Sequence, residues 1–214
     1  MPSTRYQKIN AHHYRHIWVV GDIHGEYQLL QSRLHQLSFF PEIDLLISVV
    51  DNIDRGPESL DVLRLLNQPW FTRFKGNHEA MALEAFETGD GNMWLASGGD
   101  WFFNLNDSEQ QEAIDLLLKF HHLPHIIEIT NDNIKYAIAH ADYPGSEYLF
   151  GKEIAESELL WPVDRVQKSL NGELQQINGA DYFIFGHMMF DNIQTFANQI
   201  YIDTGSPNSG RLSF

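Results

Sequence analysis

The chain has 214 residues, 43% hydrophobic and 20% charged, so it can bury one substantial core and is predicted to form a single domain over 1–214. Its formal charge of −15 argues against a nucleic-acid or anionic-membrane partner, because both require clustered Lys and Arg. The absence of cysteine excludes disulfides and thiolate metal sites, so any metal must be held by His, Asp, Glu or Asn.

The N-terminal segment 1–16 lacks the apolar stretch of a secretion signal, and no apolar run of membrane-spanning length follows it. We therefore expect a cytoplasmic protein with no membrane partner.

The first half of the chain alternates predicted strands and helices. Two short apolar runs rich in β-branched residues, 16–21 and 44–50, are typical of buried strands. The segment between them, 26–37, places leucines on one face of a predicted helix. A second helix is predicted to begin at Pro57, because proline suits a first helical position. Segment 73–86 then predicts a strand, a turn and a helix.

The second half changes from helices to hairpins. Ser108 and Gln111 have the spacing of a capping box ahead of an apolar helix over 113–120. Segments 125–140 and 192–205 each contain two β-rich runs around a polar turn, which predicts antiparallel hairpins. The whole chain is therefore predicted to be α/β, with βαβ units first and strands last.

Polar side chains gather where the predicted strands end, which is where open α/β sheets usually bind ligands. Asp22 and His24 are two residues apart in an extended segment, so both can project to one side and reach one ion. Polar residues also follow four other strands: Asp51, Asp54, Arg55, Asn77, His78, Glu79, His140 and His187. Such oxygen and nitrogen donors suit one or two divalent ions of intermediate hardness, such as manganese, iron or zinc.

Each of these features also has a purely structural explanation. Asp22 with His24 is compatible with a cap and a buried histidine, Asp54 next to Arg55 with a surface ion pair, and His140 alone with a core residue. The conjunction of three spaced motifs and two strand-end histidines favours the metal site. The tryptophans, including Trp94 and the one in segment 100–103, are assigned to the core.

Five motifs carry a resemblance to a known family: GDIHG at 21–25, VDNIDRG at 50–56, GNHE at 76–79, AHAD at 139–142 and FGH at 185–187. Together they resemble the PPP family of metal-dependent serine/threonine protein phosphatases, most of all its small bacterial and phage branch and the enterobacterial members of that branch. The likeness extends from about Ile17 to Phe214. It implies the calcineurin-like metallophosphoesterase fold, an α/β structure with a central β-sandwich flanked by helices.

The resemblance also implies a role for each motif residue. Two metal ions, most simply Mn²⁺ with Fe or Zn as alternatives, would be held by Asp22, His24, Asp51, Asn77, His140 and His187. A hydroxide that bridges the two ions would attack the phosphorus directly. His78 would protonate the departing oxygen, Asp54 would orient His78, and Arg55, with Asn77, would bind the phosphate.

The sequence departs from the family pattern in three places. Val163 occupies the first position of a W-x-R-x-R segment, so only Arg165 is carried over as a further phosphate ligand. Segment 188–190 is Met-Met-Phe where many relatives have Thr-Pro. Val50 replaces the glycine before Asp51, and crowding there is predicted to weaken metal binding, especially if φ at this position is positive. The alternative is that a strand accepts valine at this position without cost.

The predicted function is hydrolysis of phosphoserine and phosphothreonine in proteins, with phosphotyrosine as a further candidate, by a monomeric enzyme whose partners are its phosphoprotein substrates. A dinucleoside-polyphosphate hydrolase of the same fold is one alternative. The other is a weakly active phosphate-binding module, because Val50 and Val163 both depart from the pattern.

Overall fold

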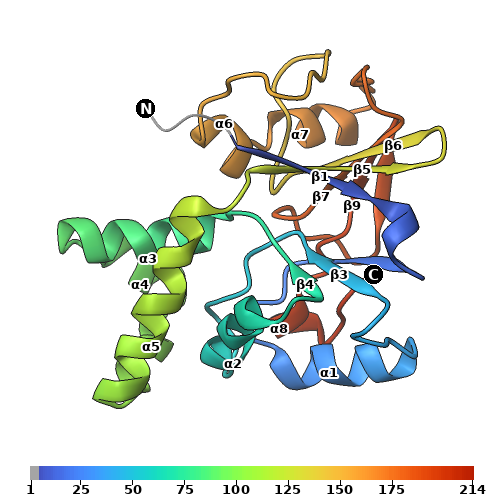
Figure 1. The fold of residues 1–214 in the computed structure, drawn as a ribbon. Coiled ribbons are helices and arrows are strands. Elements are labelled where there is room, and N and C mark those ends of the chain that lie inside the picture. The colour runs from blue at the N-terminus through green and yellow to red at the C-terminus, as the bar shows by residue number, and fades with distance from the viewer. Residues whose placement is uncertain (1–4) are drawn as a thin grey trace.

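The computed structural model describes residues 5–214, in which two β-sheets lie at the centre with helices around them (Figure 1). The smaller sheet is entirely parallel, in the order β2 (Ile17–Val20), β3 (Leu45–Ser48), β4 (Phe71–Thr72). Its strands are connected through α1 (Tyr27–Gln36) and α2 (Ser59–Arg64). This arrangement confirms the predicted βαβ beginning, in which the carboxyl ends of the three strands meet at one edge.

The larger sheet has six strands in the order β1-β5-β6-β7-β9-β8. They are β1 (Tyr6–Asn10), β5 (Ile126–Asn131), β6 (Ile134–Ile138), β7 (Tyr182–Phe185), β8 (Gln194–Phe196) and β9 (Gln199–Tyr201). The β5–β6 and β8–β9 pairs are antiparallel, which confirms both predicted hairpins. β1 was not anticipated from the sequence; it pairs in parallel with β5 at the edge of the sheet.

The helices cover the outer sides of the two sheets (Figure 1). α6 and α7 lie over the larger sheet, α1, α2 and α8 lie by the smaller one, and α3, α4 and α5 extend to one side. Beyond α1 and α2, the helices are η1 (Ala11–His13), η2 (Leu65–Asn67), α3 (Asn77–Thr88), α4 (Asn92–Ala96), η3 (Gly99–Asn104), α5 (Asp107–Leu118), η4 (Lys119–His122), α6 (Ser157–Leu160), α7 (Asp164–Leu170) and α8 (Ser206–Ser209). None of the helices within residues 5–214 is long and apolar enough to cross a membrane.

The start of α5 differs from the predicted capping box. Asn106 caps the helix: its side chain accepts a hydrogen bond from the Glu109 backbone, and the Glu109 side chain accepts one from the Asn106 backbone. The prediction of Ser108 with Gln111 was therefore wrong by two residues. Asn106 lies in the extended region of backbone space that a cap requires, whereas Ser108 is already inside the helix.

Two other element boundaries were also misplaced. α2 begins at Ser59 rather than at Pro57, because Pro57 belongs to the turn that follows the second motif. The third strand of the smaller sheet, β4, is only Phe71–Thr72, so the predicted strand in segment 73–86 lies just before that segment.

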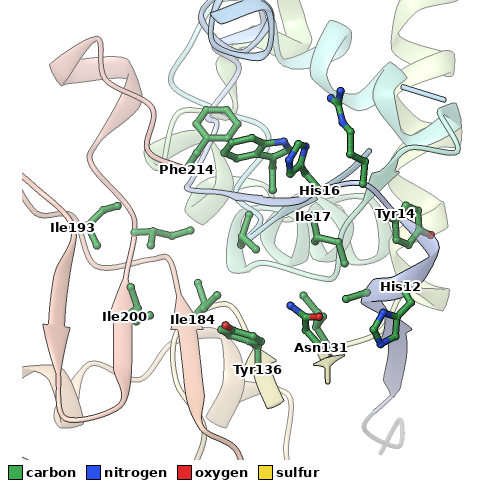
Figure 2. A pocket seen from close by; sticks show the side chains of 16 residues that line it. His12, Tyr14, His16, Ile17, Asn131, Tyr136, Ile184, Ile193, Ile200 and Phe214 are labelled. Carbon is green, nitrogen blue, oxygen red and sulfur yellow. The ribbon is translucent and has the colours of Figure 1, made fainter. Parts of the chain in front are cut away.

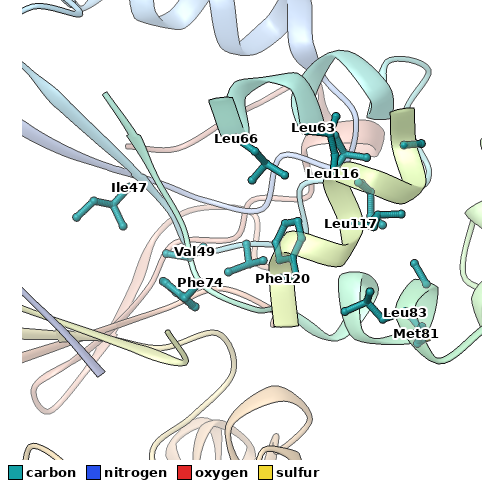
Figure 3. Packing of buried hydrophobic residues seen from close by; sticks show 14 of the residues in the cluster. Ile47, Val49, Leu63, Leu66, Phe74, Met81, Leu83, Leu116, Leu117 and Phe120 are labelled. Atoms are coloured by element: carbon teal, nitrogen blue, oxygen red, sulfur yellow. The ribbon is translucent and has the colours of Figure 1, made fainter. Parts of the chain in front are cut away.

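The main core fixes the position of the β3 strand end. Val49 lies by Phe74 and Phe120, with leucines of α2 and α5 beyond them, as Figure 3 shows, and Ile47 belongs to the same cluster. Burial of each such side chain stabilises the fold by about 1.5–3 kcal/mol. This packing holds the segment that leads to Asp51 against the helices.

Candidate metal centre

Residues from separate strand ends converge on the carboxylate of Asp51. Donor atoms of His24, Asp51 and His78 lie within 4.8 Å of one another, and the same holds for Asp51, His140 and His187. The Nε2 atom of His24 is 3.9 Å from Asp51 Oδ2, and that of His140 is 3.5 Å from Asp51 Oδ1. Asp51 thus belongs to two adjacent clusters, and each of its oxygens faces one of them.

A strained turn after β3 brings these groups together. The strand ends at Ser48, and φ is +90° at Val50 and +41° at Asp51. The Val49 carbonyl accepts a hydrogen bond from His140 Nδ1 at 2.9 Å, and the Asp51 carbonyl accepts one from the His24 backbone at 2.8 Å. Val50 therefore lies in a turn rather than in a strand. Its φ is positive, which is the case in which crowding by valine was expected to weaken metal binding most.

The histidines present nitrogen lone pairs to the centre. Nδ1 of His24 donates to the Ile53 carbonyl at 2.9 Å, and Nδ1 of His140 is engaged in the same way, so the Nε2 atoms face inward as acceptors. Burial lowers the pKa of His24 to about 3. Burial, then the neighbouring His140, lowers the pKa of His187 to about 4. Neutral imidazoles of this kind are competent metal ligands.

Asn77 stands among acceptor atoms. Its Oδ1 lies 2.6 Å from His140 Nε2 and 3.2 Å from His187 Nδ1. Its amide nitrogen, if rotated into the same position, would also be 3.2 Å from both Asp51 oxygens. The histidine nitrogens and the Asp51 oxygens are all acceptors, so the amide N–H of Asn77 would donate to them directly. The amide oxygen fits the same position when a cation lies between it and these acceptors.

Asp22 shows most clearly that the residues present suit a cation. One of its oxygens accepts a hydrogen bond from the His187 backbone at 2.9 Å, while Oδ1 is buried and has no hydrogen-bond partner among the described residues. Burial, then the nearby Asp203, raises the pKa of Asp22 well above its usual value. An unpartnered buried carboxylate oxygen is costly, and a divalent cation would satisfy it. The residues present therefore fit divalent metal ions.

The neighbouring acids differ in charge. Burial alone would raise the pKa of Asp51, but His140 and the other histidines hold it below its usual value, so Asp51 is ionised. Burial and the charge of Asp51 raise the pKa of Glu79 to about 8. Glu79 accepts hydrogen bonds from the backbone and side chain of Asn52, and so buttresses the turn behind Asp51.

His78, Asp54 and Arg55 form a connected group beside the clusters. His78 Nδ1 lies 2.6 Å from Asp54 Oδ2, which matches the predicted orienting contact. The Arg55 guanidinium lies 3.0 Å from His78 Nε2 and 3.0 Å from His24 Nε2. Arg55 and a metal ion would compete for the lone pair of His24, so metal binding there requires Arg55 to turn toward another partner.

Arg165 is engaged elsewhere. Its guanidinium donates to Asp142 Oδ1 at 2.9 Å and to the carbonyls of Tyr143 and Gly145 at 2.9 and 2.6 Å. These contacts hold the loop that follows His140. Arg165 as a phosphate ligand stays a prediction, and phosphate binding would require its guanidinium to give up some of these contacts.

Sequence reasoning missed two residues that contact the group. Trp94 and Trp101, which were assigned to the core, both donate hydrogen bonds to Asp54. The sequence could have indicated only that buried tryptophans need an acceptor for the indole N–H, and not that the acceptor would be Asp54.

A separate apolar cavity of about 730 Å³ opens between β2 and the larger sheet. Figure 2 shows Ile17, Ile184 and Ile200 around it, with Phe214 at its edge. None of the predicted metal or catalytic residues lines this cavity.

The chain belongs to the calcineurin-like phosphoesterase family, whose profile matches residues 15–190. Members of this family use divalent metal ions, and the Asp–His clusters are where this chain would hold them.

The relatives include serine/threonine-protein phosphatase 2 of Escherichia coli strain K12, 98% identical over all of this chain and 98% of the relative. The protein of that name from Salmonella typhimurium strain LT2 is 58% identical, with the same coverage. A crystal structure described as a putative diadenosine tetraphosphatase has a TM-score of 0.72 at 22% identity and covers 98% of this chain and 91% of that chain, which supports the fold alone.

Proposed function

We propose that the chain is a metal-dependent phosphoprotein phosphatase that hydrolyses phosphoserine and phosphothreonine monoesters, with phosphotyrosine as a further substrate. The observation that carries the proposal is the position of Asp51, shared by two histidine clusters next to the His78–Asp54 pair. The names of the relatives at 98% and 58% identity support the same substrate class.

The proposed metal ligands are Asp22, His24, Asp51, Asn77, His140 and His187. Two divalent ions would neutralise phosphate charge and make water a better nucleophile at neutral pH. Manganese is the proposed metal, since a histidine-rich set suits it better than magnesium, with iron or zinc as alternatives.

The other proposed roles belong to side chains beside the ligands. Arg55, once released from His24, would bind two phosphate oxygens through its planar guanidinium, and Asn77 would contact the phosphate as well. Once Arg55 has turned away from His78 Nε2 as well, His78 would carry a proton there and give it to the departing seryl oxygen. Asp54 would hold Nδ1 of His78 and stabilise the imidazolium that precedes the transfer.

His78 also lies close enough to be considered a ligand, because its Nε2 is 3.9 Å from Asp51 Oδ2. We favour the acid role because a short contact to Asp54 distinguishes His78 from the ligand histidines: burial lowers the pKa of His78, but Asp51 and Asp54 outweigh burial and raise it. The ligand histidines His24 and His187 have lowered pKa values instead.

One set of assays separates this proposal from its alternatives. Hydrolysis of p-nitrophenyl phosphate is measured with and without manganese, followed by a phosphoserine peptide and diadenosine tetraphosphate. The proposal predicts manganese-dependent turnover and preference for the peptide. Preference for the anhydride would favour the dinucleoside-polyphosphate hydrolase, and no turnover with any metal would favour the phosphate-binding module.

A monomeric state and a cytoplasmic location stay predictions. Light scattering after size-exclusion chromatography tests the first, and cell fractionation tests the second.

A further inference from the structure

The carboxylate of Asp54 is fully buried and accepts hydrogen bonds from three aromatic N–H groups. Trp94 Nε1 lies 2.9 Å from Oδ1 and 3.1 Å from Oδ2, and Trp101 Nε1 lies 2.7 Å from Oδ1. His78 Nδ1 takes the remaining position on Oδ2 at 2.6 Å. Within residues 5–214, no Lys or Arg forms an ion pair with this carboxylate.

The two tryptophans belong to one segment that packs on the second motif. Trp94 lies in α4 and Trp101 in η3, and the Gly98 carbonyl between them accepts a hydrogen bond from the Arg55 backbone at 3.2 Å. A Cβ on Gly99 would come within 2.6 Å of the Trp94 ring, so the segment is closed tightly around the indole. The segment therefore contacts both the side chain of Asp54 and the backbone of Arg55.

The hydrogen bonds determine how the carboxylate is oriented. Two donors on Oδ1 and a shared donor on Oδ2 fix its plane, and the backbone of Asp54, at φ +73°, is held by Ser59 Oγ at 3.0 Å. His78 then has one acceptor in one direction for Nδ1, which points its Nε2 atom toward the metal clusters.

A purely structural explanation would be that buried indoles bond to whichever acceptor is nearest. Trp18 argues against it, because its Nε1 is buried and has no hydrogen-bond partner among the described residues. The fold thus tolerates an unpartnered indole N–H elsewhere, whereas two indoles share one carboxylate here.

We propose that Trp94 and Trp101 are positioning residues that orient Asp54 and, through it, the general acid His78. The inference rests on the proposed phosphatase function and deepens it, since the pair would set how well the enzyme handles poor leaving groups. Hydrogen bonds to a charged group are stronger than neutral ones, so the loss of either donor should disturb the orientation of Asp54.

The test uses Trp94→Phe, Trp101→Phe and the double variant, which keep an aromatic ring and remove the donor. Turnover at saturating manganese is compared for a phosphoserine peptide, whose leaving oxygen needs a proton, and p-nitrophenyl phosphate, whose leaving oxygen needs little. Each single variant should lose about tenfold in kcat on the peptide and less than about threefold on p-nitrophenyl phosphate, with metal content unchanged.

Trp18→Phe is the matched control, because it removes an indole N–H that has no hydrogen-bond partner within residues 5–214; its ratio of the two rates should equal that of the unmodified chain. In a His78→Asn background, Trp101→Phe should cause no further selective loss on the peptide, because the acid through which it acts is gone. If the double variant fails to fold, the single variants carry the test, as each retains one donor.

Equal losses on both substrates, or a selective loss that persists in the His78→Asn background, would overturn the positioning role. An unmodified chain that hydrolyses neither substrate would overturn the proposed function, and the inference with it.

Discussion

Replacement of Val50 by glycine should tighten manganese binding and speed turnover together. Val50 is fully buried and has φ of +90°, a region that L side chains rarely adopt and β-branched ones least of all. The carbonyls of its two neighbours orient His140 and His24, and the next residue is Asp51. Strain at Val50 therefore acts on both metal clusters.

The magnitude follows from the backbone and the burial. A non-glycine residue held in a sparsely populated region costs about 1–3 kcal/mol, which glycine removes. Loss of the buried valine side chain costs about 1.5–3 kcal/mol, and the added backbone freedom costs about 0.5–1 kcal/mol. The central values of these contributions predict that the free energy of unfolding without metal falls by about 1 kcal/mol. If about half of the strain displaces Asp51, manganese binding should tighten about 2- to 10-fold.

Isothermal titration measures manganese affinity, and the rate on p-nitrophenyl phosphate measures turnover. Denaturant unfolding of the metal-free chain measures the free energy of unfolding. Val49→Gly is the matched control: it removes an equally buried valine one residue earlier, where φ is not positive, so it should lose stability and gain no affinity. Val50→Ala separates the causes, since it removes the branch and keeps the unfavourable φ. Identical titrations and rates for Val50→Gly and the unmodified chain would refute the reasoning.

Three further predictions follow from the site and from a partly buried network around Glu156. Excess EDTA should abolish activity, and manganese should restore it more fully than magnesium; full activity in EDTA would contradict the two-metal proposal. His78→Asn should lower turnover by about 10²–10⁴ with metal content nearly unchanged, whereas Asp51→Asn should strip metal; the reverse pattern in metal analysis would show that the roles are wrong. A hydrogen bond from His125 and an ion pair with Lys75 lower the pKa of Glu156 to about 2, so this carboxylate stabilises the fold above about pH 4.5 and loses that effect as pH falls toward 2. Glu156→Gln should therefore cost about 1–3 kcal/mol at pH 7 and nothing near pH 2 in denaturant unfolding, and a pH-independent difference would contradict this assignment.

The βαβ beginning and both hairpins could be predicted because their signals are local. Apolar runs and polar turns sit next to each other in the sequence, as in the β5–β6 pair around Asp132. β1 could not be predicted, because its five residues alternate poorly and its partner strand, β5, lies more than a hundred residues away in the sequence.

In the candidate site, too, some features could be predicted from the sequence and others could not. Residues at strand ends could be grouped in advance, since parallel strands bring their carboxyl ends to one edge, and the structure does bring Asp51 next to His24 and His140. The contacts of Trp94 and Arg165 could not be predicted. Both residues lie in helices outside the motifs, so their partners depend on how those helices pack. Trp94 contacts the Asp54 carboxylate, and Arg165 contacts the loop after His140.

The central claim is that Asp51 is shared between two metal ions. Anomalous diffraction from crystals soaked in saturating manganese tests it most directly. The account predicts two peaks, one bounded by Asp22, His24 and Asp51 and one bounded by Asp51, Asn77, His140 and His187. A single peak that Asp51 does not contact, or two peaks in which His78 replaces Asp22 as a ligand, would contradict it.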